Sequence, residues 1–152
     1  MKQLLIIAFA LVVNLCNAQD EIYQKVNTFI KQNHPELITQ SKILVVNFVN
    51  PSQSDDKGVH KSLEKTGSVY EVAKLKGGRN GVICVTVVKD AQSQIALNKQ
   101  GHKHIHVING SQLQNLDTNG IDNITFNSNG EVVYKNLESN KIYEAINQLI
   151  TR

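Results

Sequence analysis

Two segments of the chain are almost uninterrupted runs of apolar, mostly β-branched residues. They cover residues 43–49 (ILVVNFV) and 82–88 (VICVTVV). Such runs are typical of strands that are buried on both faces, as in the centre of a parallel sheet. The segment between them, from about residue 52 to 76, carries apolar residues that can form one face of a helix. A strand, a helical crossover and a second strand predict a parallel β-α-β unit.

Helices and a further strand are predicted on both sides of this unit. Residues 20–40 carry apolar side chains at helical spacing, and Pro35 indicates a break near their end. Residues 91–100 indicate helix only weakly. Residues 102–108 (HKHIHVI) alternate polar with apolar side chains, which predicts a half-buried strand near a sheet edge.

The C-terminal third predicts a hairpin followed by a helix. Residues 123–126 and 131–135 have strand composition, and the turn Asn127-Ser128-Asn129-Gly130 separates them. Residues 141–150 then place apolar side chains on one helical face. Because a hairpin adds an antiparallel pair to the parallel unit, the chain is predicted to be an α/β protein with a mixed sheet.

Residues 1–18 have the pattern of an export signal. Lys2 precedes an apolar run from Leu4 to Val13, and Ala18 ends a suitable cleavage site. The apolar run has ten residues, whereas a membrane span needs about 20. We therefore expect an exported protein, periplasmic or secreted, with no stable membrane span after signal removal. The alternative is a lipid attached to Cys16, although the residues before it fit such a site poorly.

Composition excludes several classes of function. The chain has 152 residues with 41% hydrophobic residues, which suits one folded domain. Its formal net charge is only +3, so we expect no nucleic-acid partner, because such proteins usually carry a clustered basic patch. There are two cysteines, Cys16 and Cys84. Removal of the signal leaves Cys84 alone, which excludes an internal disulfide and dithiol chemistry within one chain.

The order of elements and several local sequences resemble the thioredoxin-like fold, and most closely exported bacterial thiol-disulfide reductases and peroxiredoxin-like proteins. The resemblance rests on residues 44–48 (LVVNF), 82–90, 120–126 and 129–134. It implies a three-layer α/β/α sandwich with a mixed sheet, ending in a β-hairpin and a helix. It also implies three parts: a signal peptide (1–18), an N-terminal helical extension (19–40) and the thioredoxin-like domain (41–152).

The chain departs from this family at both halves of its redox site. The resemblance places Gln53 and Asp56 where the family has its two cysteines, with Ser54 and Asp55 between them. Asp122 stands where the family has a cis-proline. These five residues would form a vestigial active-site loop. A helix start also explains Asp55 and Asp56, because carboxylates stabilise the positive end of a helix dipole.

Two other features allow alternative functions. Cys84 lies within an apolar strand, where a thiol usually behaves as a small, inert hydrophobe. His102, His104 and His106 would share one face of the strand predicted over residues 102–108, because side chains alternate along a strand. Imidazoles on one face can bind copper or zinc, although the polar, solvent-facing side of an edge strand explains them without a metal and is the preferred interpretation.

We therefore expect a redox-inactive thioredoxin-like module rather than an enzyme. In the family, the groove beside the dithiol motif docks extended substrates, so the resemblance implies a protein or peptide partner in the cell envelope and no obligatory cofactor. Two alternatives stay open. One is a thiol-disulfide enzyme that uses Cys84 or a partner's cysteine, and the other is copper or zinc binding through the three histidines.

Overall fold

The computed structural model describes residues 21–38, 43–49, 60–61, 63–68, 81–114, 116–118, 120–138 and 140–151. The predicted signal peptide and the predicted loop residues Gln53, Ser54, Asp55 and Asp56 lie outside these residues.

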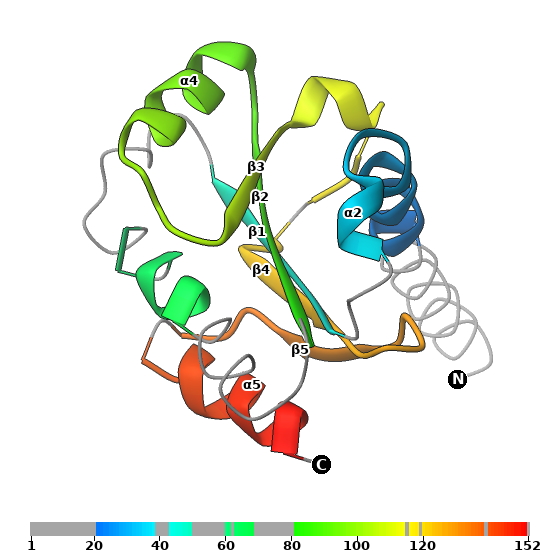
Figure 1. The fold of residues 1–152 in the computed structure, drawn as a ribbon, viewed down its shortest axis with the longest axis vertical. Helices are drawn as coiled ribbons and strands as arrows, with labels where there is room; N and C mark the ends of the chain where they lie inside the picture. Colours follow the sequence, from blue (N-terminus) through cyan, green and yellow to red (C-terminus); the bar gives the residue numbers. More distant parts are fainter. Residues whose placement is uncertain are drawn as a thin grey trace, which may run out of the picture.

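The centre of the molecule is a five-stranded mixed sheet (Figure 1). Its strands follow the order β3-β2-β1-β4-β5. β1 pairs in parallel with β2, which pairs in parallel with β3, whereas β4 is antiparallel to both β1 and β5. The strands are β1 (Ile43–Val49), β2 (Val82–Val88), β3 (Ile105–Asn109), β4 (Asn123–Phe126) and β5 (Val132–Lys135).

The predicted parallel strand pair and the hairpin are thus confirmed, and the bounds of β1 and β2 match the two apolar runs. Of the helix predicted between β1 and β2, the structure describes residues 60–61 and 63–68, and these are helical.

Helical segments precede, connect and follow these strands. Residues 21–33 form one helix, and α2 (Pro35–Ile38) follows after the break at His34. Proline suits the first position of α2 because that position needs no backbone donor. The later segments are residues 60–61 and 63–68, α4 (Ala91–Lys99), the 3₁₀ helix η2 (Gly110–Leu113) and α5 (Ile142–Thr151).

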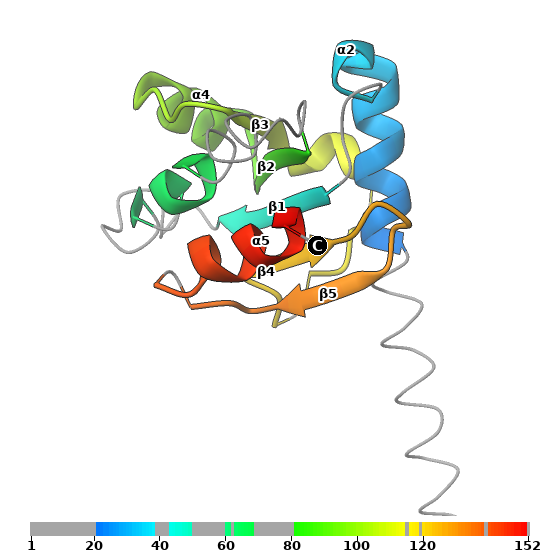
Figure 2. The same cartoon turned by 60° about the horizontal axis from the view of Figure 1, so that its bottom comes forward.

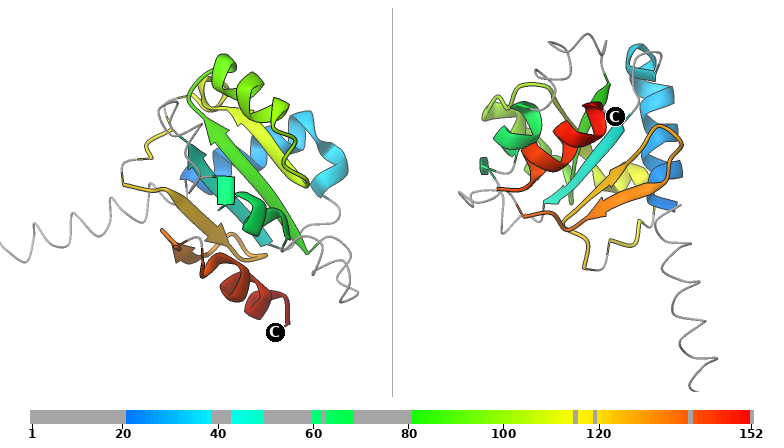
Figure 3. Two further views of the ribbon diagram at one scale, coloured as in Figure 1. Left: turned by 90° about the vertical axis from the view of Figure 1, so that its left-hand side faces the viewer. Right: turned by 90° about the horizontal axis from the view of Figure 1, so that it is seen from below.

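Helices cover both faces of the sheet, which makes three layers (Figures 2 and 3). Successive side chains of β1 point to opposite faces, as the pleat requires. Leu44 and Val46 pack with the helix over residues 21–33, whereas Ile43 and Val45 pack with α5. A further cluster, which joins Leu63 to α4, lies on the same face of the sheet as α5. The predicted α/β/α sandwich is therefore confirmed.

The helix over residues 21–33 is an integral part of the core. Ile22, Val26 and Ile30 recur at i, i+4 and i+8, and none is more than 1% exposed. The Tyr23 ring lies 5.2 Å from the ring of the fully buried Phe126 in β4, measured between centroids. The helix over residues 21–33 thus covers one face of the sheet and contacts the first strand of the C-terminal hairpin.

One predicted strand begins later than its sequence pattern suggests. β3 starts at Ile105, and residues 101, 103 and 104 lie in turns before it. Gly101 and His104 have positive φ angles of 67° and 61°, which interrupt an extended strand. The prediction of a strand from residue 102 is therefore wrong for its first three residues.

No helix in the parts of the chain that the structure describes is long and apolar enough to cross a membrane.

Candidate functional site

Asp122 lies at the edge of the sheet where the parallel strands end. Its carbonyl oxygen accepts a 2.8 Å hydrogen bond from the backbone N–H of Phe48, the next-to-last residue of β1. Its own N–H donates to Oδ1 of Asn136, and Asn136 Nδ2 donates to the carbonyl oxygen of Gly120. These bonds fix the backbone of Asp122 and leave its side chain exposed. The residues described contain no cis peptide bond, so the bond before Asp122 is trans.

A buried polar pair lies beneath this edge. Asn47 of β1 and Thr86 of β2 are neighbours in the parallel register and are 4% and 0% exposed. Within the described residues, Asn47 Nδ2 and Thr86 Oγ1 have no hydrogen-bond partner. An unpaired buried polar group costs about 1–3 kcal/mol, so this pair does not serve the stability of the sheet.

The thiol of Cys84 is in the interior of the molecule. Cys84 is 0% exposed, and its neighbours in register are Val45 of β1 and Ile105 of β3. The thiol donates to the carbonyl oxygen of Thr66 at 3.4 Å. Burial raises the pKa of the Cys84 thiol to about 12, because the apolar surroundings disfavour the thiolate. A buried thiol with a raised pKa is a poor nucleophile.

The three predicted metal ligands do not share one face of a strand. Only His106 lies in β3, whereas His102 and His104 precede it. His102 Nε2 instead lies 3.1 Å from Nδ1 of His60, in a part-buried hydrogen bond. The centroids of these two rings are 5.3 Å apart and the ring planes differ by 15°, so the rings are stacked. The expectation of a single histidine face is wrong because a turn at His104 interrupts the alternation.

His106 has a different neighbour. Its ring centroid lies 5.6 Å from that of His34, and His34 Nδ1 is 3.3 Å from a carboxylate oxygen of Glu36. No group of three or more histidine, cysteine, aspartate or glutamate side chains in the described residues is arranged to hold a metal ion. Metal binding by His102, His104 and His106 stays a prediction.

Burial and neighbouring histidines lower the pKa of two imidazoles. For His102 the largest cause is burial, followed by repulsion from His60, with Glu64 opposing both. For His106 the causes are burial, then His34, with Glu36 opposing and His104 adding a small further decrease. Both rings are therefore held neutral to a lower pH than in the unfolded chain.

We expect the folded protein to lose stability as the pH falls below about 6.5, the unfolded pKa of histidine. Above that pH both states hold these two rings neutral, so they contribute nothing. Below it the unfolded chain binds protons first, which favours unfolding until the lowered folded pKa values are reached. Urea unfolding at pH 7.5 and 5.5 measures the effect.

The matched control for this titration is the double variant H102Q/H106Q, whose side chains do not titrate. Its loss of stability between the two pH values should be smaller than that of the unchanged protein. An equal or larger loss in the double variant would contradict the assignment to His102 and His106.

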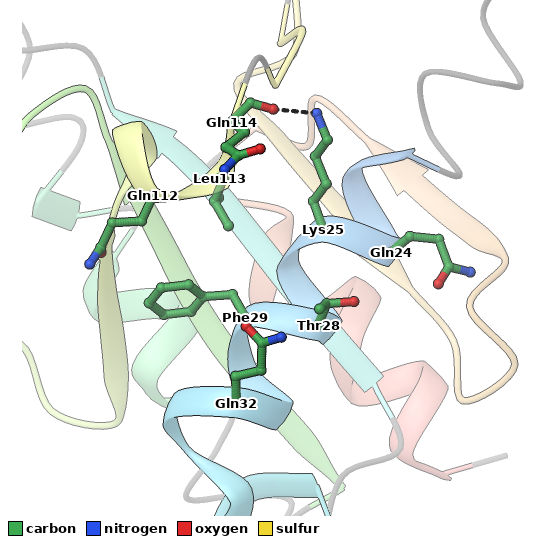
Figure 4. Close-up of a pocket in the computed structure, with 8 residues that line it drawn as sticks. All are labelled: Gln24, Lys25, Thr28, Phe29, Gln32, Gln112, Leu113 and Gln114. Atoms are coloured by element: carbon green, nitrogen blue, oxygen red, sulfur yellow. Dashed lines mark hydrogen bonds between the residues drawn. The ribbon is translucent and has the colours of Figure 1, made fainter.

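A further feature, which sequence patterns did not indicate, is a pocket of about 280 Å³ between the helix over residues 21–33 and η2. Figure 4 shows Phe29 extending from the helix toward η2. Glutamines line the pocket from both elements: Gln24 and Gln32 from the helix, Gln112 from η2 and Gln114 just after it. Since η2 directly follows β3, the pocket lies near the end of a parallel strand, where ligands of α/β proteins commonly bind.

Comparison with known sequences finds no match. No protein-family model and no curated protein matches the chain.

Comparison with solved structures does find similar folds. The thioredoxin domain of a thiol-disulfide oxidoreductase from Bacteroides vulgatus aligns with a TM-score of 0.55 and 14% identity, covering 77% of this chain and 84% of that one. A thiol:disulfide interchange protein from Bacteroides sp. gives 0.54 and 14%, covering 76% and 78%. Yeast Sco1 gives 0.54 and 17%, covering 72% and 77%. A second structure, of Sco1 with copper bound, gives 0.51 and 16%, covering 72% and 76%.

Sequence identity at this level carries the fold and not the activity. The sheet order, the helices on both faces and these alignments agree with one another. The chain therefore has the thioredoxin-like fold.

Proposed function

We propose that the protein is a thioredoxin-like binding module that has no redox chemistry of its own. The observation that carries the proposal is the position of Cys84. It is the only cysteine of the chain after residue 16, and it is buried in the central part of the sheet with a strongly raised pKa. A thiol-disulfide exchange begins with attack by an accessible thiolate, which this residue does not supply.

The edge of the sheet near Asp122 supports a role in docking. In the thioredoxin-like family, extended substrates bind beside the dithiol motif and the cis-proline. Here Asp122 lies beside the end of β1, and its exposed side chain and fixed backbone form part of that edge. We propose that a protein or peptide partner binds there, beside the end of β1. The thiols are not needed for such docking.

Export is part of this proposal. It rests on the sequence of residues 1–18, where a basic residue precedes a short apolar run and a small-residue cleavage site. A partner in the periplasm or outside the cell follows from it.

An insulin-reduction assay tests the absence of redox activity. We expect the protein to accelerate the reduction of insulin by dithiothreitol no more than buffer does, because it presents no accessible thiolate. A dithiol thioredoxin serves as the positive control. The variant C84A should behave as the unchanged protein does.

Activity that disappears in C84A would contradict the proposal. It would favour the alternative, a thiol-disulfide enzyme that uses Cys84. Activity that appears only when a cysteine-bearing protein is added would favour the other alternative, an enzyme that uses a partner's cysteine.

A further inference from the structure

The pocket between the helix over residues 21–33 and η2 is lined mainly by uncharged hydrogen-bonding groups. Its glutamines each offer a carbonyl oxygen as acceptor and an NH₂ group as donor. The charged lining residue is Lys25, whose ammonium lies 2.6 Å from a carboxylate oxygen of Glu21 and donates to the carbonyl oxygen of Gln114. Its charge is thus compensated within the protein. The lining therefore favours a ligand that is polar and neutral.

The pocket also has an apolar side. Phe29 is half-buried and Leu113 is 3% exposed, and both pack against the main core. The face of an aromatic ring carries partial negative charge, so weakly positive C–H groups pack well on it. A suitable ligand therefore combines one C–H-rich face with hydroxyl or amide groups around its edge.

The η2 side of the pocket is held in place by close packing. A Cβ atom on Gly110 would come within 2.8 Å of the carbonyl oxygen of Val88, so this position accepts only glycine without a shift of the backbone. Asn109 Oδ1 then accepts from the N–H and the hydroxyl of Ser111 at 3.0 and 2.8 Å. The helix η2 is thus fixed to the end of β2 and β3.

Gln114, at the rim, has an unfavourable backbone conformation. Its φ of 31° is positive, which side-chain-bearing residues seldom adopt. Lys25, on the facing helix, donates a hydrogen bond to the carbonyl oxygen of Gln114 and so stabilises this conformation. Strained residues persist where the surrounding structure over-determines them, and they cluster at ligand sites.

We propose that this pocket binds a neutral, polyhydroxylated ring of the size of a monosaccharide. The volume of about 280 Å³ is just below the range of small-molecule sites, roughly 300–1,000 Å³, so it suits only a compact ligand. Glutamines from two facing elements and the apolar side chains of Phe29 and Leu113 line it together. This arrangement suits a compact ring with hydroxyls around its edge. It suits an extended peptide less well, because the polar groups of a peptide are spread along the length of its backbone.

The proposal is independent of the docking function proposed above, because it involves neither Cys84 nor the residues near Asp122. A failure of the insulin assay would leave it unaffected, and its own failure would leave the redox-inactive role unaffected.

Nuclear magnetic resonance tests the pocket directly. The ¹⁵N-labelled protein is titrated with methyl α-D-glucopyranoside, methyl N-acetyl-β-D-glucosaminide and glucuronate, and separately with a capped Gly-Gln dipeptide. We expect saturable shifts at the backbone amides of Gln112 and Gln114 with at least one neutral sugar, and a Kd on the order of 1 mM for so small a ligand. Glucuronate should bind more weakly because the pocket offers no uncompensated cation.

Two variants locate the binding, and a third serves as their control. F29L keeps an apolar side chain and removes the aromatic face, and Q114G removes one amide and relieves the positive φ, so neither should unfold the protein. Each should weaken binding by about tenfold, the equivalent of one good contact. The matched control is Q92A, which removes an exposed glutamine on α4 and should leave the Kd unchanged.

Three results would overturn the proposal. The first is the absence of saturable shifts with either neutral sugar up to about 50 mM, a concentration far above the expected Kd. The second is a set of shifts confined to residues outside the pocket. The third is tighter binding of the dipeptide than of both sugars.

Discussion

A thiol reagent added to the folded protein is expected to leave Cys84 unmodified, and to modify it rapidly once urea unfolds the chain. Cys84 is fully buried, so the reagent reaches it only when the surrounding structure opens. For a typical domain the unfolded fraction is about 10⁻³ to 10⁻⁸, which sets the expected slowing at a thousandfold or more. Direct reaction in the folded state is disfavoured as well, because the raised pKa keeps the buried sulfur as the thiol.

Mass spectrometry of tryptic peptides after iodoacetamide treatment measures this effect. The peptide that spans residues 80–89 contains Cys84 and separates it from Cys16. The unfolded protein in urea gives the reference rate, and C84A gives the background of that peptide. Modification of the folded protein at a rate within about tenfold of the reference would show that Cys84 opens locally, without global unfolding.

The substitution F126A is expected to cost about 3–5 kcal/mol of the free energy of unfolding. Phe126 is fully buried in β4, and its ring packs against Tyr23 of the N-terminal helix. Truncation leaves a cavity on the face where the helix over residues 21–33 meets the sheet. Since domains of this size are stable by about 5–15 kcal/mol, the variant should unfold at a much lower urea concentration.

Circular dichroism during urea unfolding provides the measurement. The matched control F126L keeps most of the volume and should cost less than about 1.5 kcal/mol. A second control, I95A, removes an apolar side chain that is 56% exposed on α4 and should change stability by about 0.5 kcal/mol or less. If F126A cost less than about 1 kcal/mol, the packing of the helix against β4 would be refuted.

The sheet was predictable from the sequence where burial on both faces leaves little room for polar residues. β1 and β2 coincide with the two apolar runs because each is covered on both sides by helices. The hairpin was predictable for a different reason, since turn residues around Asn127 separate two strand-like segments. There the Asn127 side chain accepts hydrogen bonds from the N–H groups of Asn129 and Glu131.

The beginning of β3 could not be predicted in this way. The alternation of histidines with other residues from His102 onwards is compatible with a strand, but pairing with β2 decides where the strand starts. The register joins Ile105 to Cys84, and the backbone turns at His104 just before it. His60, which pairs with His102, is 42 residues away in the sequence, so no local pattern indicates the contact.

The glutamine-lined pocket was missed for the same physical reason. Its residues come from two segments far apart in the sequence, around Gln24 and around Gln112, and isolated glutamines form no motif. One local signal was present: Gly110 follows the strand predicted over residues 102–108 by only two positions. A glycine there indicates a close backbone approach, and the structure shows it against Val88.

The sheet order also determines when the protein can complete its fold. β1 is the central strand, and one of its two partners, β4, is made much later in the sequence. At about 5–20 residues per second, synthesis needs roughly 4–15 s to proceed from the end of β1 to the end of β4. During that interval β1 exposes an unpaired, apolar edge, which is a template for aggregation. The second side of β1 is therefore covered only once Phe126 has emerged.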